Sequence, residues 1–249
     1  MLLEGHVALV TGASRGIGAA TAQQLARNGA RVGVNYLNNT DAANAVVRSI
    51  QEHGGQAIAI KADARNKDEV AAMVARLIDE YGFIDTLVIN ASMSFPVTPF
   101  IDYPWDAFEA KLVGEMASAF HVCRAVVPAM IENNKGCIVA ISSGLSRHPS
   151  DGFSAHSAAK SALDAFMKSL AHELGPHGIR VNVVAPGLTE TDSTAFMPSQ
   201  AKQMAAKMVP LRRIGQPDDV ARAVVSLASS NSEFITGVYL PVSGGSLML

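Results

Sequence analysis

The chain has few cysteines and no long apolar segment. Only Cys123 and Cys137 occur among its 249 residues, and their spacing does not match that of a metal site. So few thiols are typical of a reduced, cytoplasmic protein. No run reaches the roughly 18 apolar residues that span a bilayer, and the first residues lack a basic region followed by an apolar stretch. We therefore expect a cytoplasmic protein without a metal, a signal peptide or a membrane partner.

The chain also lacks a strong charge of either sign. Its formal net charge is −2, and acidic and basic residues are mixed along it, which argues against a nucleic-acid partner. Apolar residues make up 49% of the sequence, which is enough for one sizeable core. We find no linker, repeat or low-complexity segment, so we expect one domain over residues 1–249. Within it we expect a cofactor half, about 1–140, and a catalytic and substrate half, about 141–249.

Short apolar runs alternate with longer amphipathic stretches. Strands that are apolar throughout are buried on both faces, as in parallel sheets. Their alternation with helices predicts an α/β fold, a single-domain Rossmann fold whose doubly wound, seven-stranded parallel sheet carries helices on both faces. Thr40 is the expected N-cap of a helix, and the irregular segments 92–104 and 188–210 are candidates for a substrate rim or lid. The expected strands are 6–10, 31–36, 56–61, 86–89, 136–142, 180–185 and 238–242, and the expected helices are 16–28, 40–52, 67–81, 155–174 and a long one that ends near 133.

A glycine-rich segment, Thr11 to Gly18, lies between the first expected strand and the first expected helix. Glycine there permits a tight turn, lets the backbone approach a pyrophosphate, and brings the helix close to the sheet. The N-terminus of that helix then faces the phosphates. Glycine spacing alone is weak evidence because turns are rich in glycine, but its place between a strand and a helix strengthens it. The segment therefore predicts a dinucleotide site.

Several segments together resemble the short-chain dehydrogenase/reductase family, and within it the 3-oxoacyl-(acyl carrier protein) reductase group. The glycine pattern matches the family's Thr-Gly-x-x-x-Gly-x-Gly. The family's Asn-Asn-Ala-Gly element has its counterpart here with Ile89 at the first position and Ser92 at the last. The resemblance covers nearly the whole chain, through the segments Ile141-Ser142-Ser143, Pro186-Gly187-Leu188-Thr189-Glu190-Thr191, 210–217, 235–237 and 244–245.

The end of the second strand bears on the choice of dinucleotide. An acidic residue there would accept a hydrogen bond from the ribose 2′-hydroxyl of NAD, but none occurs. Arg15 could instead pair with a 2′-phosphate, with Asn35 and Asn38 as further donors, so we expect NADP(H) rather than NAD(H). Asp63 resembles the family's adenine-contacting aspartate, although Asp is also common in turns. The residues expected to bind the cofactor are Gly12, Ser14, Arg15, Gly16, Ile17, Gly18, Asn35, Tyr36, Asn38, Asp63, Ala64, Asn90, Ala91, Ser92, Lys160, Pro186, Gly187, Thr189 and Thr191.

The catalytic pattern of the family is altered in this chain. The resemblance implies a serine that positions the carbonyl, a tyrosine that acts as acid and base, and a lysine four residues after the tyrosine. Ser143 and Lys160 occupy two of these positions, and His156 occupies that of the tyrosine. The family's further asparagine corresponds to Glu115, with Lys111 as a competing alignment. We therefore expect the catalytic residues Ser143, His156, Lys160 and Glu115.

The histidine leaves two functions open. One hypothesis is an NADPH-dependent oxidoreductase in which His156 replaces the tyrosine as the acid, since free imidazole titrates near neutrality. Its substrate would be a small molecule or an acyl thioester, such as a 3-oxoacyl or polyketide-like carbonyl, or else a C=N or activated C=C bond. Lys160 would lower the pKa of the imidazole, and Glu115 could offset this. The other hypothesis is a catalytically silent NADP(H)-binding sensor or partner subunit. The resemblance also implies a homo-oligomer, a tetramer that buries the apolar end Leu247-Met248-Leu249.

Overall fold

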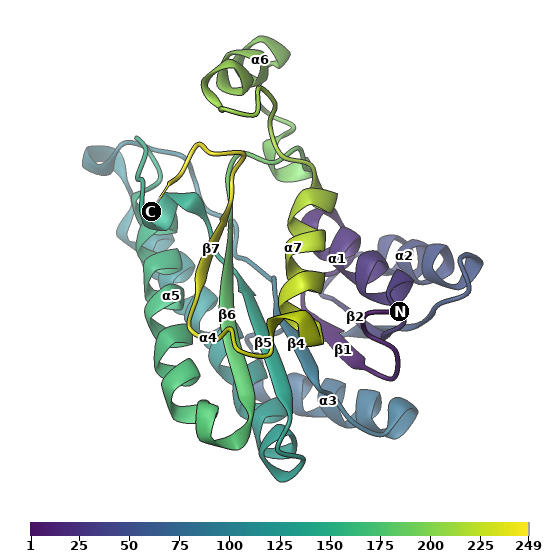
Figure 1. Cartoon of the computed structure of the whole chain (residues 1–249). Coiled ribbons are helices and arrows are strands. Elements are labelled where there is room, and N and C mark those ends of the chain that lie inside the picture. The colour runs from purple at the N-terminus through teal and green to yellow at the C-terminus, as the bar shows by residue number, and fades with distance from the viewer. Residues whose placement is uncertain (249) are drawn as a thin grey trace.

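The computed structural model describes residues 1–248, which form one seven-stranded parallel sheet between two layers of helices (Figure 1). The strand order is β3-β2-β1-β4-β5-β6-β7. All six neighbouring pairs are parallel. The predicted doubly wound α/β fold is therefore confirmed. The strands are β1 (Val7–Val10), β2 (Arg31–Tyr36), β3 (Gln56–Lys61), β4 (Thr86–Ile89), β5 (Gly136–Ile141), β6 (Ile179–Pro186) and β7 (Tyr239–Val242).

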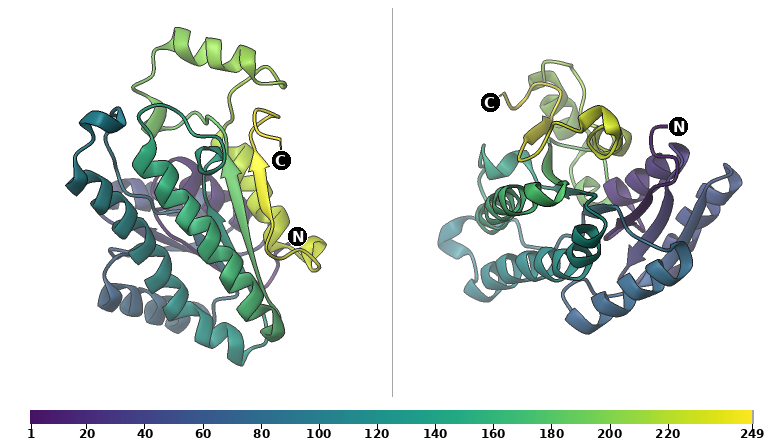
Figure 2. Two further views of the ribbon diagram at one scale, coloured as in Figure 1. Left: turned by 90° about the vertical axis from the view of Figure 1, so that its left-hand side faces the viewer. Right: turned by 60° about the horizontal axis from the view of Figure 1, so that its bottom comes forward.

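The helices connect successive strands and cover both faces of the sheet (Figure 2). Their boundaries match the sequence pattern to within a residue or two where it was specific, which is the usual uncertainty of a helix end. One cap differs from our expectation. Asn39, not Thr40, caps α2, because its side-chain oxygen accepts the backbone N–H of Ala42 at 2.9 Å. The α-helices are α1 (Gly16–Arg27), α2 (Thr40–Glu52), α3 (Lys67–Tyr81), α4 (Trp105–Glu132), α5 (Ser154–Leu174), α6 (Ser199–Met208) and α7 (Pro217–Ala228).

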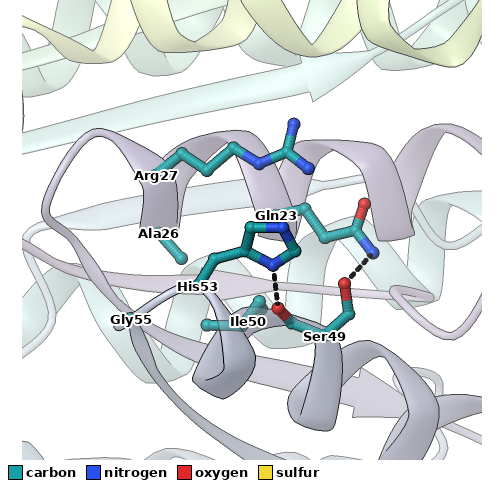
Figure 3. Close-up of a pocket in the computed structure, with 7 residues that line it drawn as sticks. All are labelled: Gln23, Ala26, Arg27, Ser49, Ile50, His53 and Gly55. Carbon is teal, nitrogen blue, oxygen red and sulfur yellow. Dashed lines mark hydrogen bonds between the residues drawn. The ribbon is translucent and has the colours of Figure 1, made fainter.

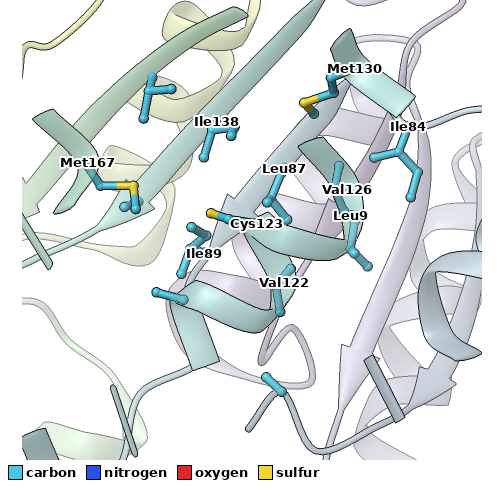
Figure 4. Packing of buried hydrophobic residues seen from close by; sticks show 14 of the residues in the cluster. Leu9, Ile84, Leu87, Ile89, Val122, Cys123, Val126, Met130, Ile138 and Met167 are labelled. Atoms are coloured by element: carbon cyan, nitrogen blue, oxygen red, sulfur yellow. The ribbon is translucent and has the colours of Figure 1, made fainter. Parts of the chain in front are cut away.

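Two apolar clusters hold the layers together, one on each face of the sheet. The first joins α3, α4 and α5 to the sheet, with Leu87, Cys123 and Met167 among its members (Figure 4). The second joins α1, α2 and α7 to the opposite face. Because β1, β4, β5 and β6 contribute residues to both clusters, their side chains are buried on both sides of the sheet, which explains the continuous apolar runs in the sequence. None of the helices within residues 1–248 is long and apolar enough to cross a membrane.

The two irregular segments lie near the carboxyl end of the sheet. The first contains only a short 3-10 turn, Phe100–Asp102. The second contains α6, which buries none of its residues and stands away from the sheet (Figure 1). At the end of the chain, Leu247 packs against the first apolar cluster, whereas Met248 is exposed. Leu249, the last residue of the expected apolar end, lies outside the described residues.

Candidate active site

A cleft of about 650 Å³ opens at the carboxyl end of the sheet. It lies beside β1 and β4, where the strand order reverses direction, the usual ligand site of open α/β sheets. Its volume falls within the range of small-molecule pockets. Sixteen of the residues expected at the site line this cleft: Gly12, Ser14, Arg15, Gly16, Ile17, Gly18, Asn35, Asn38, Asp63, Ala64, Asn90, Ala91, Ser92, His156, Lys160 and Thr191.

The loop after β1 requires glycine at specific positions. Gly12 and Gly16 have φ values of +61° and +56°, the left-handed region that side chains disfavour. A Cβ on Gly12 would lie 2.9 Å from the Ala91 backbone. One on Gly18 would lie 2.4 Å from the Asn90 amide nitrogen and 2.5 Å from the Gly12 oxygen. The glycines thus keep the floor of the cleft free of side chains.

The N-terminus of α1 faces the cleft without a capping side chain. Arg15 is its N-cap residue, it makes no side-chain cap bond, and no acidic residue lies in the first turn. Free backbone N–H groups and the helix dipole favour an anion at this position. Arg15 is exposed, and within residues 1–248 it forms no ion pair. The loop and the helix end therefore fit the phosphates of a dinucleotide.

Two asparagines brace the loop instead of contacting a ligand with free donors. The Asn90 amide donates to the carbonyls of Thr11 and Gly12, at 2.9 and 3.0 Å. The Asn35 amide donates to the carbonyls of Ile60 and Ala62, and its oxygen accepts the Gly12 N–H. Our expectation that Asn35 would donate to a 2′-phosphate is therefore corrected, because both of its N–H groups are already bonded inside the protein.

Asp63, at the end of β3, is paired with a neighbouring arginine. The Arg65 guanidinium donates to both carboxylate oxygens, at 2.9 Å from Nε and 2.7 Å from Nη2. This hydrogen bonding lowers the pKa of Asp63. The carboxylate lines the cleft, so it combines the turn role and the cleft position that the sequence left open.

At the other end of the cleft, a buried carboxylate lies between two buried ammonium groups. Glu115 Oε1 is 2.6 Å from Lys160 Nζ, and Glu115 Oε2 is 2.6 Å from Lys111 Nζ. Lys160 also donates to the Ile141 carbonyl at 2.7 Å. All three charged side chains are at most 5% exposed. Glu115 and Lys111 were competing candidates for one position, and the structure brings both into one cluster.

The protonation of this cluster follows from its burial and its charges. Burial opposes the charged form of Glu115, but the ammonium groups of Lys160 and Lys111 outweigh it and lower the pKa of Glu115 to about 2. Burial also lowers the pKa of Lys111 to about 8, and the nearby Glu115 limits that fall. At neutral pH the cluster therefore holds two cations and one anion.

His156 lies at the edge of this cluster and is stacked on an aromatic ring. Its imidazole is parallel to the Phe95 ring, with centroids 4.7 Å apart. Its Nδ1 is buried and has no hydrogen-bond partner within residues 1–248. Burial, followed by the charges of Lys160 and Lys111, lowers the pKa of His156 to about 3, against a smaller opposing effect of Glu115. The imidazole is therefore neutral at neutral pH.

Ser143 is held beside the cleft and does not line it. Its Oγ accepts the backbone N–H of Leu145 at 3.2 Å, and its carbonyl accepts the Tyr239 hydroxyl at 2.9 Å. Among the described residues, no hydrogen bond joins it to His156 or Lys160. The preceding residue, Ser142, lines the cleft instead.

Some predicted cofactor residues lie outside the cleft, and others were missed. Tyr36 and Thr189 are buried, and Thr189 Oγ1 donates to the Gly187 carbonyl. Pro186 ends β6 and also falls outside the lining. The cleft residues that were not among those expected lie at or shortly after strand ends, or within the 188–210 segment, so their position relative to the strands could have indicated them: Leu37, Asn39, Ala62, Met93, Ile141, Ser142, Asp192 and Ser193.

Another hollow, between α1 and α2, is too small to hold a ligand (Figure 3). Its volume is about 10 Å³, roughly the space for one water molecule. His53 Nδ1 is 2.7 Å from the Ser49 carbonyl, and Gln23 donates to the Ser49 hydroxyl, so the polar groups there are already bonded. This hollow therefore has no room for a ligand larger than a water molecule.

Comparison with known proteins assigns the chain to a family. Residues 12–246 match the family model described as enoyl-(acyl carrier protein) reductase. A 3-oxoacyl-(acyl-carrier-protein) reductase of Staphylococcus aureus (strain Mu50) is 36% identical over 97% of this chain and 98% of its own. One of Synechocystis sp. is 38% identical over 99% and 98%. A Chlamydia trachomatis reductase of the same name is 35% identical over 98% of both chains. The chain therefore belongs to the short-chain dehydrogenase/reductase family, whose members are NAD(P)-dependent oxidoreductases.

Proposed function

We propose that the protein is an NADPH-dependent reductase of a carbonyl-type substrate, such as a 3-oxoacyl thioester or a polyketide-like ketone. The observation that carries this proposal is a single cleft that runs from the N-terminus of α1 to Lys160 and His156. One end of the cleft fits a dinucleotide phosphate, and the other offers proton-bearing groups. Relatives named as reductases of 3-oxoacyl groups on an acyl carrier protein support this substrate class.

The charges around the cleft favour NADPH over NADH. No carboxylate stands at the end of β2, where NAD-dependent sites place one. Arg15 is exposed at the phosphate end of the cleft and could form charge-assisted hydrogen bonds with a 2′-phosphate. The glycine loop, Asn38 and Thr191 would hold the rest of the dinucleotide. When bound, the reduced nicotinamide supplies the hydride for the reduction.

The polar residues at the other end of the cleft would supply the proton and position the substrate. Lys160 holds its proton at Nζ beside Glu115, and it is the lysine that lines the cleft. A neutral His156 can donate one hydrogen bond to a carbonyl oxygen, but it is a weak acid toward a developing alkoxide. Ser143 would orient the substrate from its position beside the cleft, next to the lining residue Ser142. These roles extend the family pattern to the residues of this chain.

A second candidate function has one observation in its favour. The pKa of His156, lowered to about 3, deprives the site of an imidazolium acid near neutrality. A family member that binds NADP(H) as a sensor or partner subunit would tolerate that loss. The buried Lys160–Glu115 pair would then serve cofactor binding alone.

We also propose that the protein forms a homo-oligomer, a tetramer. Several large apolar side chains are exposed on its surface, including Val113 and Phe120 on α4 and Phe234 after α7. Exposed apolar groups of this kind are typical of surfaces that bind other subunits. Analytical ultracentrifugation would give the oligomeric state directly.

Oxidation of NADPH with a panel of carbonyl substrates tests the main proposal. The panel would contain 3-oxoacyl thioesters, diketones, quinones and imines, assayed with the wild type, His156→Tyr and the control His172→Gln, an exposed histidine on the same helix. We expect turnover by the wild type and by His172→Gln. A silent wild type together with an active His156→Tyr would support the second candidate, because the scaffold would then lack only the acid.

A further inference from the structure

Lys111 is a buried charge beside the cleft that the proposed function does not use. Its side chain is completely buried near the start of α4. Its three N–H groups have three acceptors: the Ser92 hydroxyl at 2.8 Å, the Met93 carbonyl at 2.9 Å and the Glu115 carboxylate at 2.6 Å. The ammonium also lies 5.1 Å from the centre of the Phe95 ring. A buried ammonium group is costly unless it is paired. The pairing of all three N–H groups beside the cleft leads us to ask what Lys111 does there.

The contacts of Lys111 form a continuous polar path. Ser92 accepts from Lys111 and donates to Glu115 Oε2 at 3.1 Å. Glu115 Oε1 then contacts Lys160. Ser92 is exposed and lines the cleft, so the path runs from solvent to the Lys160 ammonium.

The charged groups around Lys111 come from three parts of the fold. Glu115 lies one turn away on α4, Lys160 and His156 face it from α5, and the Asp63–Arg65 pair lies in the loop after β3. Since His156 is neutral, it supplies no imidazolium proton at neutral pH, and the ammonium groups of Lys111 and Lys160 remain as proton-bearing cations beside Glu115. They are therefore the groups from which a reduction would draw its proton.

We propose that Lys111 and Ser92 are positioning residues that return a proton to Lys160 through Glu115. This inference rests on the proposed reductase function. It assigns the replenishing of the acid to residues 92 and 111 and leaves His156 as a neutral hydrogen-bond donor.

The protons balance along the path. When a carbonyl is reduced to an alcohol, its oxygen gains one proton, which we trace to Lys160 Nζ. Lys111 gives one proton to Glu115 Oε2, and the carboxyl group passes it to Lys160 after turning about its Cγ–Cδ bond, because the two lysines contact different oxygens. Once Lys111 is a neutral amine, the Ser92 hydroxyl turns from Glu115 toward it and donates its proton while it takes one from a solvent water, and that water is reprotonated from bulk solution. The cluster then has the charges with which it began.

Substitution of Lys111 separates proton delivery from packing. Lys111→Met removes the ammonium, and Lys111→Arg keeps a positive charge that cannot be deprotonated. With a 3-oxobutanoyl thioester as substrate, we expect both variants to lose about a hundredfold in kcat, the typical contribution of acid–base catalysis. KM and NADPH affinity should change by about twofold at most, and Lys168→Met, an exposed lysine on α5, should match the wild type. A wild-type kcat in Lys111→Arg would show that Lys111 has only a structural role and would overturn the proposal.

A titration of the lysine signals by NMR tests the path without any substrate. In the wild type labelled at its lysine side chains, we expect the Lys160 signal to respond at the pH where Lys111 titrates, since one carboxylate couples them. Glu115→Gln should abolish that response. Independent titration of the two lysines would overturn the path even if the enzyme is active. A coupled titration in a protein without turnover would support the path and count against the reductase.

Discussion

The two ends of the cleft are built by different means. At the end that we propose for the dinucleotide, the exposed groups belong to the backbone, namely left-handed glycines and the bare N-terminus of α1, and asparagine side chains hold the loop in place. At the end that we propose to be catalytic, the polar groups are the side-chain charges of Lys111, Glu115 and Lys160, which are buried and paired with one another. A site built from the backbone limits the size of the side chains that fit there. A cluster of buried charges requires each member to keep its charge, because the others depend on it.

The largest effect should come from removing the one negative charge of the cluster. Glu115→Gln leaves two buried ammonium groups without their carboxylate. Breaking a buried pair in this way typically costs about 3–5 kcal/mol, and the pKa of Lys111 should fall further because its stabilising partner is gone. Urea unfolding would measure the loss.

The matched control is Glu109→Gln, an exposed glutamate on the same helix. It should change the free energy of unfolding by less than about 0.5 kcal/mol, as surface substitutions usually do. Equal stability of the two variants would remove the distinction between the ends of the cleft, because the cluster would then contribute no more than a surface residue.

A methyl group at the glycine loop should have a smaller effect of another kind. Gly18→Ala places a carbon 2.4 Å from the Asn90 amide nitrogen and 2.5 Å from the Gly12 oxygen. Overpacking of this sort costs about 1–3 kcal/mol, and we expect it mainly as weaker NADPH binding, by about tenfold to a hundredfold. Fluorescence titration with NADPH would measure this change.

Gly175→Ala is the control for that measurement. A Cβ at this position meets no atom within 4 Å, and its φ of −52° suits any residue. NADPH affinity should be unchanged. If Gly18→Ala also bound NADPH normally, the close backbone approach would not be a requirement of the cofactor site.

The same contrast decides how much of the molecule could be predicted from its sequence. Strand boundaries and the glycine loop follow from local patterns, since apolar runs and left-handed turns are properties of consecutive residues. The hydrogen bonds of the Asn35 amide could not be predicted, because they go to Ile60 on the neighbouring strand and to Ala62 directly after it. Nor could the role of Lys111, which α4–α5 packing brings into a cluster with Lys160 through Glu115. The spacing of residues along the chain does not reveal which polar groups already have all their hydrogen-bond partners inside the protein.

The histidine offers a test that depends on pH. In the folded protein the pKa of His156 is about 3, well below its ordinary value of 6.5. Between these values the unfolded chain binds a proton that the folded chain does not, so stability should fall as the pH drops through this window. His156→Gln should remove that loss and gain about 2 kcal/mol over the wild type between pH 7 and pH 4, after discounting for partial exposure.

Urea unfolding at both pH values, with His172→Gln as the exposed control, would measure this difference. The control should follow the wild type. If the difference in unfolding free energy between His156→Gln and the wild type were the same at pH 7 and pH 4, the folded chain would protonate the imidazole as readily as the unfolded chain does. His156 would then again be a candidate for the acid.

The smallest effect should distinguish the two dinucleotides at the backbone-built end. Arg15 is exposed, so the hydrogen bonds that we propose between it and a 2′-phosphate would be screened by solvent. Arg15→Ala should weaken NADPH binding by about tenfold, or about 1.4 kcal/mol, and leave NADH binding unchanged, because NADH lacks that phosphate. Arg27→Ala, at the opposite end of α1, should change neither. Equal losses for both dinucleotides would place Arg15 on the pyrophosphate, which the two share, and would leave the preference for NADPH without a charged residue to explain it.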